Sequence, residues 1–308
     1  MGRPVRLYIQ DGTYFVTARV TQQRMLLRPS TSTNELAGGV LAKAVSRFPV
    51  QLYGFVFTSN HVHLLLRASD GCLSAFMQFL LGNLARKVGR VVDWRGTFWE
   101  RRFSAEPVLD DEATENRLKY ILAHGVKEGL VRRVTDWPGL SCVHQLLGDN
   151  RRAFTWFHWA LRWQRRRLRT DALGLFDEAL AEDVELQLSA IPSWAGLSAQ
   201  ERMRRAEALI EEIETEGRQQ HRNVRGVRHV RAQPPQRRPR RASHSPRPLC
   251  HASTRGAWWS WLCQYKAFRY AYQLASRRYR EGAADVVFPP LSFRPPLIRG
   301  VTTTLVAA

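Results

Sequence analysis

The chain has 308 residues, enough to bury a hydrophobic core without disulfide or metal staples. Its 47 lysines and arginines outnumber its 27 aspartates and glutamates, which gives a net charge of +20 with histidine neutral. Roughly +6 of this charge lies in residues 1–150 and roughly +14 in residues 151–308. This balance is unlike that of an ordinary metabolic enzyme and indicates a polyanionic partner.

The N-terminus and the cysteines bear on the compartment. No apolar core followed by small residues opens the chain, and no run of about 18 apolar residues occurs. The four cysteines are widely spaced and form no CxxC pair. We therefore expect a cytoplasmic protein that neither spans a membrane nor carries a disulfide framework.

The first 150 residues alternate β-rich runs with amphipathic segments. In chain order these are a strand over 14–20, a helix over 35–48 capped by Asn34, strands over 50–57 and 61–66, a helix over 73–92, an extended stretch over 97–108 and a helix that opens at Asp110. The order β-α-β-β-α-β-α predicts an α+β fold of the ferredoxin-like, split βαβ type. We expect an antiparallel sheet with helices on one face, plus a C-terminal helix that carries Tyr120.

The second half has a different composition, and we expect a mostly helical, partly disordered basic extension there. Aromatic and basic residues over 153–168 favour a helix, and Ser198 with Glu201 forms a capping-box pattern at the start of another. No Asp or Glu occurs between Gly217 and Arg280. We divide the chain into a first domain, a helical basic appendage, an Arg/Pro-rich flexible linker, and an aromatic helix with a Pro-rich tail, over residues 1–150, 151–217, 218–256 and 257–308.

A pair of histidines lies on the predicted strand over 61–66. His61 and His63 are two residues apart, so their side chains point to the same face of a strand. An isolated pair of this kind is equally typical of polar residues on the wetter side of a sheet. The motif alone is therefore weak.

A third histidine follows a tyrosine on the helix that opens at Asp110. Tyr120 and His124 are four residues apart and therefore share one face of that helix, one turn apart. A tyrosine at the rim of the core, with a histidine near the helix C-terminus, is the structural alternative. The remaining histidines, His251 among them, lack a partner at ligand spacing, and we expect them on the surface or in the linker.

Four motifs in order carry a resemblance to a known family. They are Phe15–Arg19, Asn60–Leu66, Phe98–Phe103 and Tyr120–Val131 followed by Trp137-Pro138. Together they resemble the single-tyrosine HUH transposases of small insertion sequences, most of all the REP-associated tyrosine transposases. The resemblance covers about residues 10–147, roughly half of the chain.

The resemblance implies a reaction and the residues that perform it. In the family, two histidines hold a divalent cation on the scissile phosphate of single-stranded DNA, and a helix tyrosine attacks that phosphate. A 5′-phosphotyrosine and a free 3′-hydroxyl result. His61 and His63 occupy the ligand positions and Tyr120 the nucleophile position, which implies DNA nicking and strand transfer by residues 1–150 without a nucleotide cofactor. The preference of the family for hairpin-bearing DNA is likewise carried over from the resemblance.

One position departs from the family pattern. Four residues after the tyrosine the family usually has an amide side chain, whereas this chain has His124. Three imidazoles suit transition ions better than Mg²⁺, so the expected Mg²⁺ or Mn²⁺ cofactor is shifted towards Mn²⁺. A three-histidine hydrolytic phosphodiesterase in which Tyr120 is a bystander is one alternative. A non-catalytic nucleic-acid-binding protein is the other, and a monomer and a dimer are equally compatible with the sequence.

Cations interleaved with aromatic residues mark the expected DNA-binding surface. Such sites combine phosphate contacts with base stacking. The candidates are Arg86, Lys87, Arg90, Trp99, Arg101, Arg102, Arg165, Arg166 and Arg167. Three further tyrosines, Tyr265, Tyr270 and Tyr272, lie in an aromatic run that favours packing or stacking over nucleophilic attack.

Overall fold

The computed structural model describes residues 5–69, 71–167, 174–239, 248–283, 285–290 and 292; the side chains of Arg165, Arg166 and Arg167 lie outside this description. The strands are β1 (Thr13–Arg19), β2 (Val50–Phe57), β3 (His61–Ala68), β4 (Ser104–Val108), β5 (Arg151–Phe157) and β6 (Ala181–Gln187). The helices are α1 (Thr31–Arg47), α2 (Leu73–Val91), α3 (Asp111–Lys127), α4 (Val143–Leu146), α5 (Trp159–Arg167), α6 (Ala199–Gln220), α7 (Val227–Ala232) and α8 (Arg255–Arg280). Short 3₁₀ turns cover Thr21–Gln23, Val134–Asp136, Glu178–Leu180 and Pro192–Trp194.

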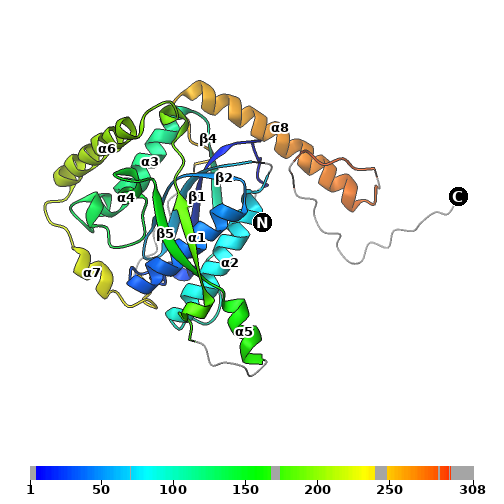
Figure 1. The fold of residues 1–308 in the computed structure, drawn as a ribbon. Helices are drawn as coiled ribbons and strands as arrows, with labels where there is room; N and C mark the ends of the chain where they lie inside the picture. The colour runs from blue at the N-terminus through cyan, green and yellow to red at the C-terminus, as the bar shows by residue number, and fades with distance from the viewer. Residues whose placement is uncertain are drawn as a thin grey trace.

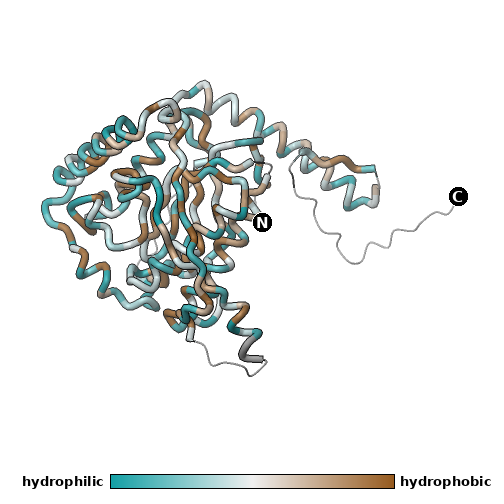
Figure 2. The backbone as a smooth tube through the Cα atoms, in the orientation of Figure 1, coloured by the Kyte–Doolittle hydropathy of each residue, from teal (hydrophilic) through white to brown (hydrophobic). Residues whose placement is uncertain are grey.

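The central sheet has four antiparallel strands in the order β2-β3-β1-β4 (Figure 1). With α1 after β1 and α2 after β3, this is the split βαβ arrangement. The predicted order β-α-β-β-α-β-α and the α+β fold class are thus confirmed. The strands are the hydrophobic centre of the molecule, whereas α6 is largely hydrophilic (Figure 2).

The two faces of the sheet carry different residues because side chains alternate along each strand. Val62 and Leu64 of β3 are fully buried in the main core, on the face covered by α1 and α2. His61 and His63 point to the opposite face, over which α3 packs against β2 and β3. The sheet therefore separates the layer of α1 and α2 from the layer that holds the histidines.

The start of α1 differs from the prediction. The helix begins at Thr31, and the Ser30 side chain accepts a hydrogen bond from the Thr33 amide at 3.1 Å. Asn34, the expected cap, instead donates its side-chain amide to the carbonyl of Pro138 at 2.8 Å. Residues 30–34 are all Ser, Thr or Asn, which are all good caps, so the sequence alone does not single out Ser30.

The expected helix over 153–168 is wrong in its first half. Residues Arg151–Phe157 form β5, which pairs antiparallel with β6, and only Trp159–Arg167 is helical. The run Phe154-Thr155-Trp156-Phe157 is rich in aromatic and β-branched residues, which fit a strand once a partner is present. The pair of strands β5 and β6 packs on α1, where Gly38 and Gly39 leave room for Phe154 and for the Thr155 backbone.

Two helices of the second half, α6 and α8, lie where the sequence predicts helices. The capping box of Ser198 and Glu201 begins α6 as predicted, and α8 covers the expected aromatic helix. Within the expected linker, α7 buries Val230, and His251 forms a bridge with Val108 of β4. The division of the chain into four parts stays a prediction.

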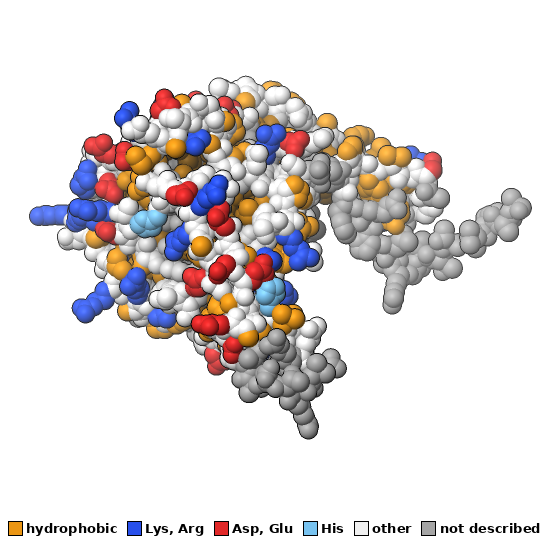
Figure 3. Space-filling view, viewed as in Figure 1, with side chains coloured by type: hydrophobic (Ala, Val, Ile, Leu, Met, Phe, Trp, Pro, Cys, Tyr) orange, Lys and Arg blue, Asp and Glu red, His pale blue; other side chains and the backbone are white. Residues whose placement is uncertain are grey.

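The surface combines mixed charge with exposed aromatics. Basic and acidic side chains are interspersed over the face seen in Figure 3, and hydrophobic side chains follow α8, which leads away from the body. Among them, Trp259 is 56% exposed and Tyr270 is 70% exposed. None of the described helices is both long and apolar enough to span a membrane.

Candidate active site and metal centre

Strand pairing places two of the three histidines. β3 pairs with β1 so that His61 lies opposite Arg19 and His63 opposite Thr17. The Thr17 hydroxyl lies 2.9 Å from Nδ1 of His63, and Phe15 stacks on the His63 ring with centroids 5.0 Å apart. The predicted shared face of His61 and His63 is therefore present, and β1 holds His63 in place.

Helix α3 brings the third histidine over the same face. Asp110 caps α3 by accepting a hydrogen bond from the Ala113 amide at 2.8 Å, as the acidic start predicts. The helix can approach β2 closely because Gly54 has no side chain: a Cβ there would lie 2.7 Å from Cδ1 of Leu118. With α3 so seated, His124 is buried at the sheet.

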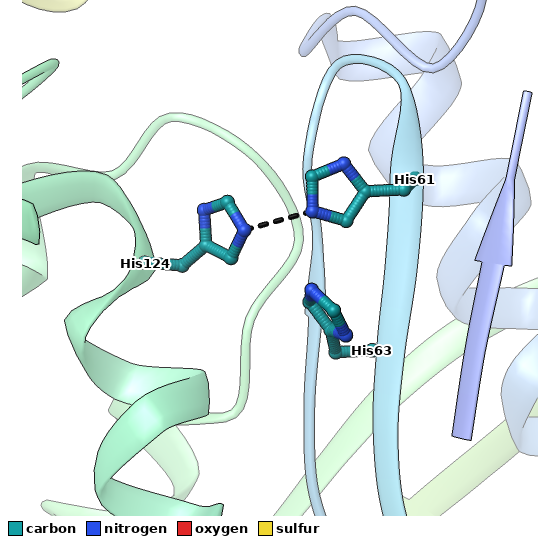
Figure 4. A group of neighbouring side chains, drawn as sticks. All are labelled: His61, His63 and His124. Atoms are coloured by element: carbon teal, nitrogen blue, oxygen red, sulfur yellow. Dashed lines mark hydrogen bonds between the residues drawn. The ribbon is translucent and has the colours of Figure 1, made fainter. Parts of the chain in front are cut away.

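The three imidazoles converge on one point (Figure 4). Nε2 of His61 lies 2.8 Å from Nε2 of His124, and one ligand nitrogen of each histidine, His63 included, lies within 4.8 Å of the others. Nδ1 of His61 is hydrogen-bonded to the Thr58 hydroxyl at 2.9 Å and faces Oδ1 of Asn60 at 2.6 Å. Such partners fix the orientation of a ligand ring and leave its other nitrogen for a metal.

The protonation of these rings suits metal binding. Burial, reinforced by His124 and His63, holds the pKa of His61 well below its ordinary value. Burial lowers the pKa of His124 to about 4. Both rings are therefore neutral at pH 7 and present lone pairs, and three imidazoles are a donor set that fits a divalent transition ion.

Tyr120 lies one helical turn before His124 and faces the same cluster. Its half-buried ring meets the His63 ring edge-on at 5.5 Å. Cations flank it, with Nζ of Lys127 at 4.8 Å and Cζ of Arg117 at 5.1 Å from the ring centroid. Burial, with Glu128, raises the pKa of Tyr120, while Arg117 and Arg19 oppose that rise. The phenol is thus protonated at neutral pH, with cations beside it that favour the phenolate.

These groups line a cavity of about 550 Å³. Residues from beyond the resembling segment complete its wall, and among them is His251. Its Nε2 lies 3.0 Å from Oε2 of Glu106, and its ring meets Phe15 edge-on at 5.5 Å. The expectation of a surface or linker position for His251 is therefore wrong. No local pattern could have shown this, because Glu106 is 145 residues away in sequence.

The other candidate residues are spread over several places. Arg86 and Arg90 are exposed on α2, whereas Lys87 is buried and donates its ammonium to the Phe157 carbonyl. Arg101 and Arg102 are exposed after Trp99, which donates its indole N–H to the Leu81 carbonyl at 2.9 Å. The side chains of Arg165, Arg166 and Arg167 lie outside the described residues. The further tyrosines Tyr265, Tyr270 and Tyr272 do not line the cavity of the three histidines.

Residues 13–124 match the model of the family described as "Transposase IS200 like". The matched segment begins with β1 and ends at His124, so it contains the sheet, Tyr120 and all three histidines. Residues 13–124 are therefore similar to an IS200-like transposase domain. The expected resemblance, and with it the assignment to a transposase class of enzyme, is confirmed.

The chain is also similar to individual proteins. The REP-associated tyrosine transposase of Escherichia coli (strain K12) is 25% identical over 142 residues, which are 46% of this chain and 81% of that protein. A relative from Haemophilus influenzae is 26% identical over 144 residues, which are 43% of this chain and 81% of that protein. A solved structure of a REP-associated tyrosine transposase bound to a REP hairpin covers 59% of this chain and 98% of its own, with 21% identity and a TM-score of 0.41.

Proposed function

We propose that the IS200-like transposase domain nicks single-stranded, hairpin-bearing DNA and transfers the cut strand, with Tyr120 as the nucleophile. The observation that carries this proposal is the placement of Tyr120 and His124 one turn apart on α3, facing His61 and His63 of β3 in one cavity. A nucleophile beside a cluster of neutral metal ligands is a combination that catalyses phosphodiester cleavage. We take the reaction to occur in the cytoplasm.

The chemistry follows from the groups around Tyr120. Its phenolic oxygen attacks the scissile phosphorus, the bond from phosphorus to the 3′-oxygen breaks, and a 5′-phosphotyrosine forms. The phenolic proton passes to solvent and the departing 3′-oxygen takes one up. Arg117 and Lys127 favour the phenolate by their charge. Because the phosphotyrosine conserves the phosphodiester energy, a 3′-hydroxyl can later displace the tyrosine without ATP.

His61, His63 and His124 would hold the divalent cation of this reaction. When bound, such a cation polarises a phosphoryl oxygen and neutralises developing charge. Three nitrogen donors favour Mn²⁺ or a later transition ion over Mg²⁺, which prefers oxygen ligands. His124 in place of an amide is the basis for this preference.

The proposed DNA partner rests on charge and on the relatives. The net charge of +20 favours a polyanion. The E. coli relative bears the name of a REP-associated tyrosine transposase. The family that this chain resembles prefers hairpin-bearing DNA, so hairpin-bearing single strands are the first substrates to test.

The decisive experiment detects the covalent intermediate. The full chain is incubated with end-labelled hairpin-bearing single strands and Mn²⁺, and an SDS-resistant protein–DNA adduct is sought. We expect the adduct from the unchanged chain and none from Tyr120→Phe. Tyr270→Phe is the matched control, since Tyr270 is 70% exposed on α8 and lies outside the cavity.

Other outcomes would identify the alternatives. An adduct that survives Tyr120→Phe would exclude Tyr120 as the nucleophile. Metal-dependent cleavage without any adduct would indicate a three-histidine phosphodiesterase. Binding without cleavage of any strand would indicate a nucleic-acid-binding protein that does not cut.

A further inference from the structure

A second cavity lies between α2 and the segment that runs from β5 into α5. It has a volume of about 490 Å³ and shares no lining residue with the cavity of the three histidines. Because α2 covers the face of the sheet opposite α3, the two cavities belong to different layers. This volume lies within the range of small-ligand sites.

One wall of the second cavity is a row of cations on α2. Arg90 follows Lys87 by three residues and Arg86 by four, so it lies one helical turn from each of them, and all three line the cavity. Arg86 and Arg90 are exposed, and Nη2 of Arg86 donates to Asn83 of the same helix at 3.1 Å. No carboxylate is among the described residues that line the cavity.

The facing wall is made of indole rings. Trp156 is the penultimate residue of β5, while Trp159 and Trp163 are four residues apart on α5, one turn from each other. Trp163 is 61% exposed, which is unusual for so large an apolar side chain. The indole N–H of Trp159 donates to the Leu175 carbonyl at 2.8 Å. That bond fixes the ring.

Lys87 ties the two walls together. Its Nζ lies 4.2 Å from the centroid of Trp156 and 4.6 Å from that of Trp159, at cation–π distance from both. Only 4% of Lys87 is exposed. Cζ of Arg90 also lies 5.9 Å from the centroid of Trp159. These contacts explain the order of Trp156 and Trp159, whereas the exposed Trp163 and Arg86 line the same cavity but take no part in them.

We propose that this cavity binds an unpaired segment of single-stranded DNA, with bases stacked on Trp163 and Trp159 and phosphates against Arg86 and Arg90. An exposed indole next to a half-buried one, beside cations with no carboxylate among the described lining residues, is a combination that suits single-stranded nucleic acids. The proposal goes beyond cleavage, because it concerns retention of DNA at a site remote from Tyr120. It holds whether or not Tyr120 cuts.

Binding is measured with the full chain in EDTA, so that cleavage cannot contribute. A fluorescein-labelled ten-nucleotide oligo(dT) is titrated and its anisotropy recorded. Loss of one stacking ring weakens single-strand binding by about fivefold or more, which we expect for Trp163→Ala. Trp259→Ala is the matched control, because Trp259 is 56% exposed and also lies near a cation, Nζ of Lys266 at 5.7 Å, yet is outside the cavity.

A crosslinking measurement locates the strand directly. Oligo(dT) carrying 5-iodouracil is irradiated with the full chain, and the crosslinked peptide is identified by mass spectrometry. We expect crosslinks at Trp159 or Trp163. Equal weakening by Trp163→Ala and Trp259→Ala, unchanged binding in Trp163→Ala, or crosslinks confined to other segments would each overturn the proposal. Equally tight binding of a duplex of the same length would overturn it too, because stacked bases cannot reach the indoles.

Discussion

Nε2 of His61 on β3 lies 2.8 Å from Nε2 of His124 on α3, although 63 residues separate them in sequence. At this separation one of the two nitrogens carries a proton and donates it to the lone pair of the other. A cation bound between them would replace that proton. We therefore expect His124 to set the metal preference of this site.

Replacing His124 by the amide of related proteins changes the metal preference. We expect adduct formation by the unchanged chain to be faster with Mn²⁺ than with Mg²⁺, and His124→Asn to narrow that difference, because an amide oxygen suits Mg²⁺ better than imidazole does. Initial rates with each ion at equal concentration test this. Equal rates of the unchanged chain with Mg²⁺ and Mn²⁺ would contradict it.

The Thr17 hydroxyl lies 2.9 Å from Nδ1 of His63 and orients that ring. We expect Thr17→Val to weaken Mn²⁺ binding by about 10-fold to 100-fold, the usual effect of losing a hydrogen bond behind a ligand. Isothermal titration measures the affinity. Thr114→Val is the control, since Thr114 is also buried but bonds only to the Asp110 carbonyl, at 2.8 Å. Comparable losses in both variants would show that the hydroxyl of Thr17 has no special role.

The site was largely predictable from local spacing, because its members lie on regular elements. Alternation on a strand puts His61 and His63 on one face, and a four-residue interval puts Tyr120 and His124 on another. That the two faces meet came from the family resemblance. The spacing alone contains no information about how α3 packs on β3.

Pairings between distant segments were not predictable. β5 needs β6 as a partner about thirty residues later, and AEDVELQ has only Val184 and Leu186 as apolar alternating residues to indicate a strand. His251 likewise takes its position from a bridge to Val108 and a bond to Glu106, neither of which leaves a pattern around His251. The segment before His251 is rich in arginine and proline, a composition that favours a flexible linker and indicates no contact with the sheet.

The bond between His251 and Glu106 fastens the C-terminal segment to the sheet. Both side chains are largely buried, at 11% and 8% exposure. We expect His251→Ala to lower the free energy of unfolding by about 1–3 kcal/mol, because the Glu106 carboxylate loses a buried partner. Urea denaturation measures this. His144→Ala, at an exposed position on α4, should change the stability by less than about 0.5 kcal/mol, and equal effects of the two variants would contradict the assignment.

Replacing two helical glycines by alanine should change the stability of the protein in opposite directions. A Cβ on Gly39 of α1 would collide with the backbone carbonyl of Thr155 in β5, so we expect Gly39→Ala to destabilise the protein by about 1–3 kcal/mol. A Cβ on Gly82 of α2 would meet only the tip of Arg86, at 3.8 Å, so Gly82→Ala should stabilise it by about 1 kcal/mol. Urea denaturation of both variants tests whether β5 packs on α1. A stabilising Gly39→Ala would contradict that packing.

The buried ammonium of Lys87 predicts how stability depends on pH. Burial lowers its pKa from 10.5 to about 8, whereas the unfolded chain keeps the ordinary value. Between these values the unfolded state binds more protons, so the contribution of Lys87 to stability rises with pH from about 8 towards 10.5 and is lost as pH falls through 8. We therefore expect the unchanged chain to gain stability relative to Lys87→Met between pH 7.5 and pH 9.5, measured by urea denaturation.

Lys119→Met is the control. Ion pairs with Glu212 and Glu216 raise the pKa of Lys119 despite its partial burial, so the contribution of Lys119 to stability should stay constant over that interval. If the difference in unfolding free energy between the unchanged chain and Lys87→Met is also constant with pH, the ammonium of Lys87 stays charged between its two indoles.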